Sequence, residues 1–154
     1  MGPAGDGQEN VSAGTSWSFG ITTLCLTAPG SVTITGVAFD QPTGGLHIEA
    51  FATRPNPYPL GKSGLGAEPT PLASLGGGFV LGGLQPIDSV CPKPGDEQSW
   101  TGGSEFAIQA SKTVSGMAKS ASLVVTYVTA GSSRTLAIPF GVSLCAVGPQ
   151  GPCP

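Results

Sequence analysis

Hydrophobic and polar positions alternate along much of this chain, and that pattern predicts β-strands. The longest alternating segment is 134–147, which we expect to be a half-buried strand of an antiparallel sheet. Its apolar residues of one parity are Leu136, Ile138, Phe140, Val142 and Leu144. We expect this parity, and Ile138 and Phe140 in particular, to face the interior.

Six further segments have the composition of strands, because they are rich in β-branched, aromatic or alternating apolar residues. They are 17–26, 31–40, 46–53, 77–84, 105–112 and 120–129. The apolar phase of 17–26 slips by one residue at Thr22-Thr23, which predicts a β-bulge. No segment of ten or more residues has a helical repeat.

The connections divide into tight turns and two long loops. Short Gly/Pro-rich stretches predict turns at 28–31 and 41–45, and 130–133 predicts a hairpin. The segments 54–76 and 85–103 combine many prolines with few strand-forming residues, so we expect long loops at the surface.

The ends of the chain are predicted to lie outside the domain proper. Residues 1–15 have no periodicity and are expected to be a flexible leader. The domain then covers 16–147, and 148–154 forms a tail that a disulfide ties back.

About seven short strands with turns rich in glycine and proline predict an all-β fold, in which two antiparallel sheets pack as a sandwich. The order of strands and turns resembles that of immunoglobulin-like sandwiches in general. The resemblance implies an architecture and no activity.

Composition excludes several classes of function. Six basic residues, scattered along a chain of net charge −3, cannot form a phosphate-binding stripe, so no nucleic-acid partner is expected. No run approaches the roughly 20 apolar residues of a membrane-spanning helix. The first residues lack the features of a signal peptide, so an exported protein would be represented by its mature part.

The four cysteines indicate an oxidising compartment. Cys25, Cys91, Cys145 and Cys153 are too widely spaced for a zinc site, and an even number at wide spacing is typical of disulfides. Parity directs Cys25 and Cys145 away from the core. We favour Cys25–Cys91 with Cys145–Cys153, because a disulfide between adjacent parallel strands is geometrically awkward. The rival pairing, Cys25–Cys145 with Cys91–Cys153, stays open, since first and last strands of a sandwich often lie side by side. The expected localisation is extracellular or in the cell envelope.

Catalytic and metal-binding patterns are absent from the sequence. The single histidine, His47, excludes any site that needs two histidines, and no nucleophile motif is present. His47 and Glu49 share a strand face and could touch one ligand, but we favour the explanation that this face is simply solvated. The nine carboxylates show no spacing that singles out a pair. We therefore expect no cofactor, no metal and no enzyme activity.

Two aromatic residues in the long loops are the candidate ligand-binding residues. Tyr58 lies in 54–76 and Trp100 in 85–103, where exposed rings could stack on a sugar or anchor a protein. Each ring could instead pack down and pin its own loop.

The function expected is a non-catalytic binding or adhesion module with a protein or glycan partner at the cell surface. A self-assembling structural subunit of a surface layer or filament is the alternative, because a low charge opposes association weakly. A carboxylate-dependent glycoside hydrolase is a third reading.

Overall fold

The computed structural model describes residues 4–56, 64–148 and 153, and this part of the chain is all-β. Its only helical element is a short 3-10 turn, η1 (Leu72–Ser74). The strands are β1 (Ala4–Gln8), β2 (Trp17–Leu24), β3 (Thr33–Phe39), β4 (His47–Pro55), β5 (Ala67–Glu68), β6 (Val80–Leu81), β7 (Ser104–Ser111), β8 (Ala118–Ser120), β9 (Leu123–Thr129), β10 (Ser132–Ile138) and β11 (Phe140–Leu144). The prediction of an all-β fold is confirmed.

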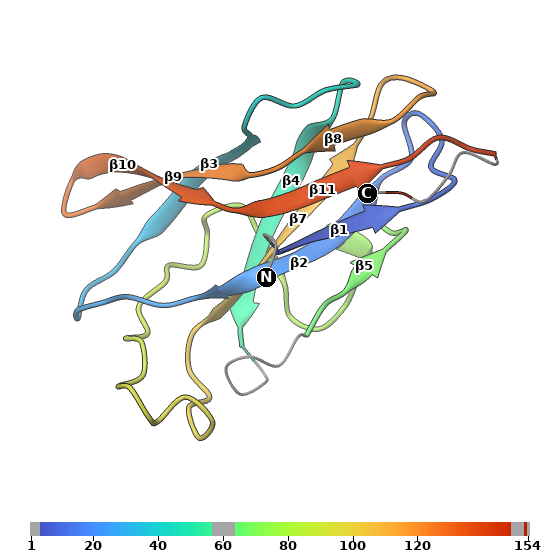
Figure 1. Cartoon of the computed structure of the whole chain (residues 1–154). Coiled ribbons are helices and arrows are strands. Elements are labelled where there is room, and N and C mark those ends of the chain that lie inside the picture. The colour runs from blue at the N-terminus through green and yellow to red at the C-terminus, as the bar shows by residue number, and fades with distance from the viewer. Residues whose placement is uncertain (1–3, 57–63, 149–152, 154) are drawn as a thin grey trace.

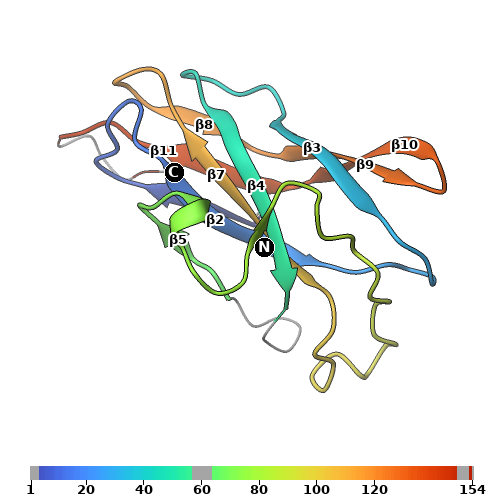
Figure 2. The same cartoon turned by 180° about the vertical axis from the view of Figure 1, so that it is seen from behind.

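One layer is a five-stranded sheet with the order β5-β2-β7-β4-β6, in which all neighbours are antiparallel. The predicted alternation explains its inner face. Phe19 of β2 pairs across the ladder with Ile108 of β7, and both side chains are fully buried. Figures 1 and 2 show this sheet from opposite sides, behind and in front of the second layer.

The second layer is made of two three-stranded sheets, β10-β9-β3 and β1-β11-β8. The two sheets are continuous with each other, because the chain passes from β8 directly into β9 and from β10 directly into β11 (Figure 1). β1 runs parallel to β11, and the other pairs are antiparallel.

The hydrophobic core lies between these layers. Its largest fully buried members are Phe19, Phe106, Leu46, Ile108, Leu123 and Leu144. Residues of all the long strands contribute to it, so the two layers share a single main core.

The long strand predicted over 134–147 is divided at Pro139, between β10 and β11. Proline has no N–H to offer a strand ladder, which explains the break. The inward parity is confirmed for Val142 and Leu144, which are fully buried, whereas Ile138 and Phe140 are half-buried against the core.

The bulge predicted in the first long strand is present one residue earlier than expected. The register between β2 and β7 shifts between Gly20 and Thr22, so Ile21 is the additional residue. The apolar side chains on both sides of the shift still reach the core.

The expectation of a flexible leader over residues 1–15 does not agree with the structure. Ala4–Gln8 forms β1, and Val11 is 1% exposed in the core. The sequence AGDGQ has no apolar alternation, because β1 is held through its backbone. Gly5 lies so close to β11 that an added Cβ would be 2.8 Å from the carbonyl oxygen of Gly141.

Both disulfides of the favoured pairing are present, and no described cysteine is free. The rival pairing is wrong. Cys91 lies beside the end of the first long strand because its N–H donates to the carbonyl of Leu26, at 2.8 Å. The Cys145–Cys153 bond joins Cys153 to the residue that directly follows β11.

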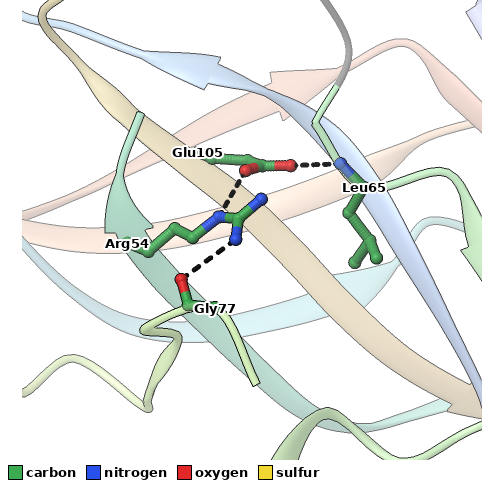
Figure 3. A network of polar contacts seen from close by, with 4 residues as sticks. All are labelled: Arg54, Leu65, Gly77 and Glu105. Carbon is green, nitrogen blue, oxygen red and sulfur yellow. Dashed lines mark hydrogen bonds and ion pairs between the residues drawn. The ribbon is translucent and has the colours of Figure 1, made fainter. Parts of the chain in front are cut away.

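Part of the predicted loop 54–76 covers the outer face of the five-stranded sheet. Leu72 packs there on Ala52 and Ala107 in a small second core. Arg54 and Glu105, on neighbouring strands, form a buried ion pair with 2.6 Å between Nε and Oε2, and Glu105 also accepts the N–H of Leu65 (Figure 3). The Arg54 guanidinium donates to the carbonyl of Gly77, so this pair fastens the covering segment at two points.

Candidate functional site

Of the two loop aromatics predicted to bind a ligand, Trp100 lies within the described residues. Tyr58 lies outside the described residues. Trp100 is half-buried, and its indole lies over the backbone of its own loop, where a Cβ added to Gly102 would be 2.8 Å from Cε2. Its role in binding stays a prediction.

A large groove lies elsewhere, at one end of the sandwich. We call it the end groove: it lies between the segment 24–32 and the inner faces of β3, β9 and β10, and its volume is about 520 Å³. Ile87, from the second predicted loop, also lines it. Proteins that bind small molecules or peptides commonly use hollows of this size.

The floor of the end groove is a regular piece of sheet. The strand register places Ile34, Tyr127 and Arg134 in one row across β3, β9 and β10. Val125 and Leu136 form the next row of the same face. Alternation along each strand therefore brings apolar side chains, one phenol and one guanidinium to the same surface.

The wall of the end groove is the chain that follows β2. This segment contains the predicted turn at 28–31, and the Cys25–Cys91 disulfide anchors it to the second loop. Val32 and Ile87 exchange backbone hydrogen bonds of 2.9 and 2.8 Å at the other side. These two attachments fix the wall at both of its ends, and Arg134 and Leu136 of β10 remain exposed.

Arg134 gives the end groove its charge. It is exposed and has no acidic partner among the described residues, in which Arg54–Glu105 is the ion pair found. Leu136, two residues further along β10, is 46% exposed. The site therefore combines the exposed Leu136, beside a floor whose Ile34 and Val125 are buried, with a cation that no carboxylate of the described chain neutralises.

A second polar cluster surrounds Glu49, which occupies a bulge of β4 opposite β7. Its Oε2 accepts hydrogen bonds from Ser16, at 2.7 Å, and from Gln109, at 2.5 Å. Burial raises the pKa of Glu49, but hydrogen bonds from Ser111, Ser16 and Gln109 together with the nearby His47 lower it by more. The net pKa lies below its usual range, so the carboxylate is held as an acceptor.

His47 lies beside this cluster, as its shared strand face predicted. Its Nδ1 is 2.9 Å from the carbonyl of Gly45, and its Nε2 is 3.3 Å from the hydroxyl of Ser111. The polar side chains of the cluster thus already have partners within the protein. Residues 4–56, 64–148 and 153 contain no group of three or more histidine, cysteine or acidic side chains that could hold a metal.

Sequence reasoning missed the end groove, although one signal for it was present. The apolar parity of the last long strand, followed back from Leu136, falls on Arg134. A cation at an inward position of a strand indicates that the inner face is open there. The wall has no comparable signal, because the path of 24–32 depends on a distant disulfide.

Comparison with known proteins adds no assignment: no protein-family model, no curated protein and no solved structure matches this chain.

Proposed function

We propose that this protein is a non-catalytic binding module with an immunoglobulin-like fold, located outside the cell or in the cell envelope, and that the end groove is its binding site. The observation that carries the proposal is that the exposed apolar Leu136 and the unneutralised Arg134 line the same groove. A ligand with an apolar body and one anionic group complements both features.

The immunoglobulin-like assignment is supported by the order of the strands. In such domains the second, fifth and fourth strands form one sheet, and the third, sixth and seventh form the other. Here β2-β7-β4 and β3-β9-β10 have the same chain order within their sheets. The parallel β1 then lies beside the last strand.

The expected localisation is supported by the two disulfides, because such bonds persist in oxidising compartments. No helix in the described part of the chain is long and apolar enough to cross a membrane. The low content of charged residues, 10%, also suits a surface that approaches another surface with little repulsion.

The test is a binding screen followed by matched substitutions. Wild-type protein is screened against a glycan array and against alkyl carboxylates of increasing length, such as decanoate. Each ligand found is then titrated against Leu136→Asp and against Met117→Asp. Met117 has nearly the same exposure as Leu136, 44% against 46%, and lies outside the end groove.

We expect Leu136→Asp to weaken binding at least ~10-fold, because the new carboxylate removes apolar floor and neutralises Arg134. Met117→Asp should leave the affinity unchanged. A ligand that binds Leu136→Asp with the wild-type affinity would show that its site lies outside the end groove. The loop of Trp100 would then be the next candidate. Turnover of chromogenic glycosides in the same screen would favour the hydrolase reading.

Self-assembly is the second candidate function, because β10 pairs only with β9 among the described residues and leaves one edge open. Open edges are common sites of association between sheets. Sedimentation velocity over a wide concentration range separates the two functions. A single species with the sedimentation coefficient of a monomer supports the binding module. Oligomers whose size increases with protein concentration support the structural subunit.

A further inference from the structure

The open edge of β10 adjoins the end groove directly. Ser132–Ala137 are all exposed, and the described residues supply β10 with a neighbour on one side only. Further along the same side, β11 is already paired with β1. Among the described residues, the pairing with β1 starts at Ala4–Phe140, so the edge of β10 from Ile138 back to the hairpin has no partner strand.

Hairpin geometry identifies the backbone groups that this edge offers. Ala130 and Gly131 have φ of 49° and 77°, so they form a two-residue turn of type I′, whose flanking residues Thr129 and Ser132 are hydrogen-bonded to each other. Hydrogen-bonded and non-hydrogen-bonded pairs alternate along an antiparallel ladder. The N–H and C=O groups of Ser133, Thr135 and Ala137 consequently point away from β9.

The side chains between these positions line the end groove. Arg134 and Leu136 project from β10 onto the floor, whereas Thr135 belongs to the opposite face. A strand added to the edge would extend the floor by one strand. Every second side chain of that strand would then lie beside Arg134 or Leu136.

We propose that the ligand of the end groove is an extended polypeptide segment of another protein, which binds as an additional strand beside β10. This inference rests on the proposed function. The segment would alternate so that apolar residues face Leu136 and an acidic residue faces Arg134. Backbone hydrogen bonds supply the common part of the affinity, and the groove selects the side chains.

A second copy of the chain fits this edge less well. β10 has the sequence SSRTLAI and contains no acidic residue. Antiparallel pairing of two copies about Thr135 would place Leu136 of one copy opposite Arg134 of the other. Such a pair leaves both guanidinium groups unneutralised, so charge complementarity favours a different, acidic partner.

The experiment uses a phage-displayed library of random heptapeptides, because β10 has 7 residues. Peptides are selected on wild-type protein after counter-selection on Thr135→Pro. Proline removes one outward N–H, and an edge strand tolerates it where that N–H faces solvent. Thr135→Val, which keeps the N–H, is the matched control.

We expect enriched peptides to carry Asp or Glu flanked at alternate positions by apolar residues. Synthetic copies should bind Thr135→Val normally and Thr135→Pro at least ~10-fold more weakly. Replacing the acidic residue of the peptide by lysine should abolish binding to the wild-type protein. Arg134→Gln should bind the acidic peptide and its lysine variant with similar affinity. Bound peptide should slow hydrogen exchange at the amides of Ser133, Thr135 and Ala137.

Methylation of alternate backbone nitrogens in the peptide tests strand addition even if Thr135→Pro fails to fold. In an added strand, only one of the two alternating sets of peptide nitrogens faces β10, so methylation of that set alone should weaken binding. Equal affinity of peptides methylated on either set would overturn the inference but leave the end groove as a site. Absence of any enrichment would overturn it as well, while the glycan and carboxylate screen still decides the proposed function. If wild-type protein forms a dimer and Thr135→Pro is monomeric, the partner of the edge is a second copy of the chain, which would also overturn the inference.

Discussion

Arg54 and Glu105 illustrate how a single pair of residues organises a neighbouring segment. Their side chains are 13% and 5% exposed, and each makes a further contact with the covering segment. The Arg54 guanidinium also lies 4.3 Å from the ring centroid of Phe79. The pair therefore acts less as an isolated ion pair than as the attachment of a segment with few strand-forming residues (Figure 3).

Replacement of Glu105 by glutamine should destabilise the protein by about 3 kcal/mol, because it leaves the buried Arg54 charge without its counter-ion. Urea unfolding followed by circular dichroism measures the change. Glu97→Gln, at an exposed position, is the control and should change the stability little. Equal stability of the two variants would mean that the pairing of β5 with β2 and the packing of Leu72 are sufficient to hold the covering segment.

Glu49 gives a prediction about pH. Its pKa is lowered from the ordinary value of 4.5, so the carboxylate is favoured in the folded state. Its contribution to stability is complete above the unfolded pKa and is lost as pH falls through the folded pKa. The effect is small because Glu49 is exposed and solvent screens it.

The difference in unfolding free energy between wild type and Glu49→Gln should therefore be constant near neutral pH and shrink below pH 4.5. Unfolding curves taken at several pH values between neutral and acid provide the measurement. A difference that instead grew toward acid pH would contradict the assigned hydrogen bonds.

At the scale of elements, strands with strong alternation were predictable and those without it were not. The predicted segments 31–40 and 105–112 correspond to β3 and β7, whose side chains record which face is buried. The sequence of β1 has no alternation of apolar residues, because Ala, Gly, Asp and Gln can pair through the backbone without facing a core. The division at Pro139 could have been foreseen from the missing N–H.

The candidate site was predictable only in part for the same reason. Arg134 stands out at an inward position, but the wall of the end groove depends on the Cys25–Cys91 bond between distant segments. Four cysteines allow three pairings, and strand parity could rank them but could not exclude the rival.

The different burial of two phenylalanines, Phe106 in β7 and Phe140 in β11, predicts different costs of mutation. Phe106→Ala should destabilise by roughly 3–5 kcal/mol, the usual range for a fully buried phenylalanine. Phe140→Ala should cost about 2 kcal/mol, because Phe140 is only half-buried against the core. Denaturant melts of both variants test the order, and a larger cost at Phe140 would place it deeper than the structure does.

At the scale of the whole molecule, the disulfides join regions that the sheets leave separate. Cys25–Cys91 connects residues 66 apart in sequence, whereas Cys145–Cys153 connects residues 8 apart. The entropy that a cross-link removes from the unfolded chain grows with the loop that it closes. The two bonds should therefore differ in their contribution to stability.

Loss of Cys25–Cys91 by double alanine substitution should cost about 4 kcal/mol, and loss of Cys145–Cys153 about 2.5 kcal/mol. Thermal or urea unfolding of the two double variants gives the comparison. The intact mass of unreduced protein should be lower than that of reduced protein by about four hydrogens. Thiol labelling of the denatured, unreduced protein would contradict both bonds.

The parallel pairing of β1 with β11 has a mechanical consequence. Force applied at Ala4 and at the far end of β11 loads the two strands in shear, so the hydrogen bonds from Ala4–Phe140 to Gln8–Leu144 bear tension together. The Cys145–Cys153 bond passes the load covalently to β11. Resistance to pulling is governed by the rate of unfolding, and bonds that must break simultaneously lower that rate. The pairing of β1 with β11 should therefore slow unfolding when force is applied along these two strands. The edge of β10 is not part of that pairing.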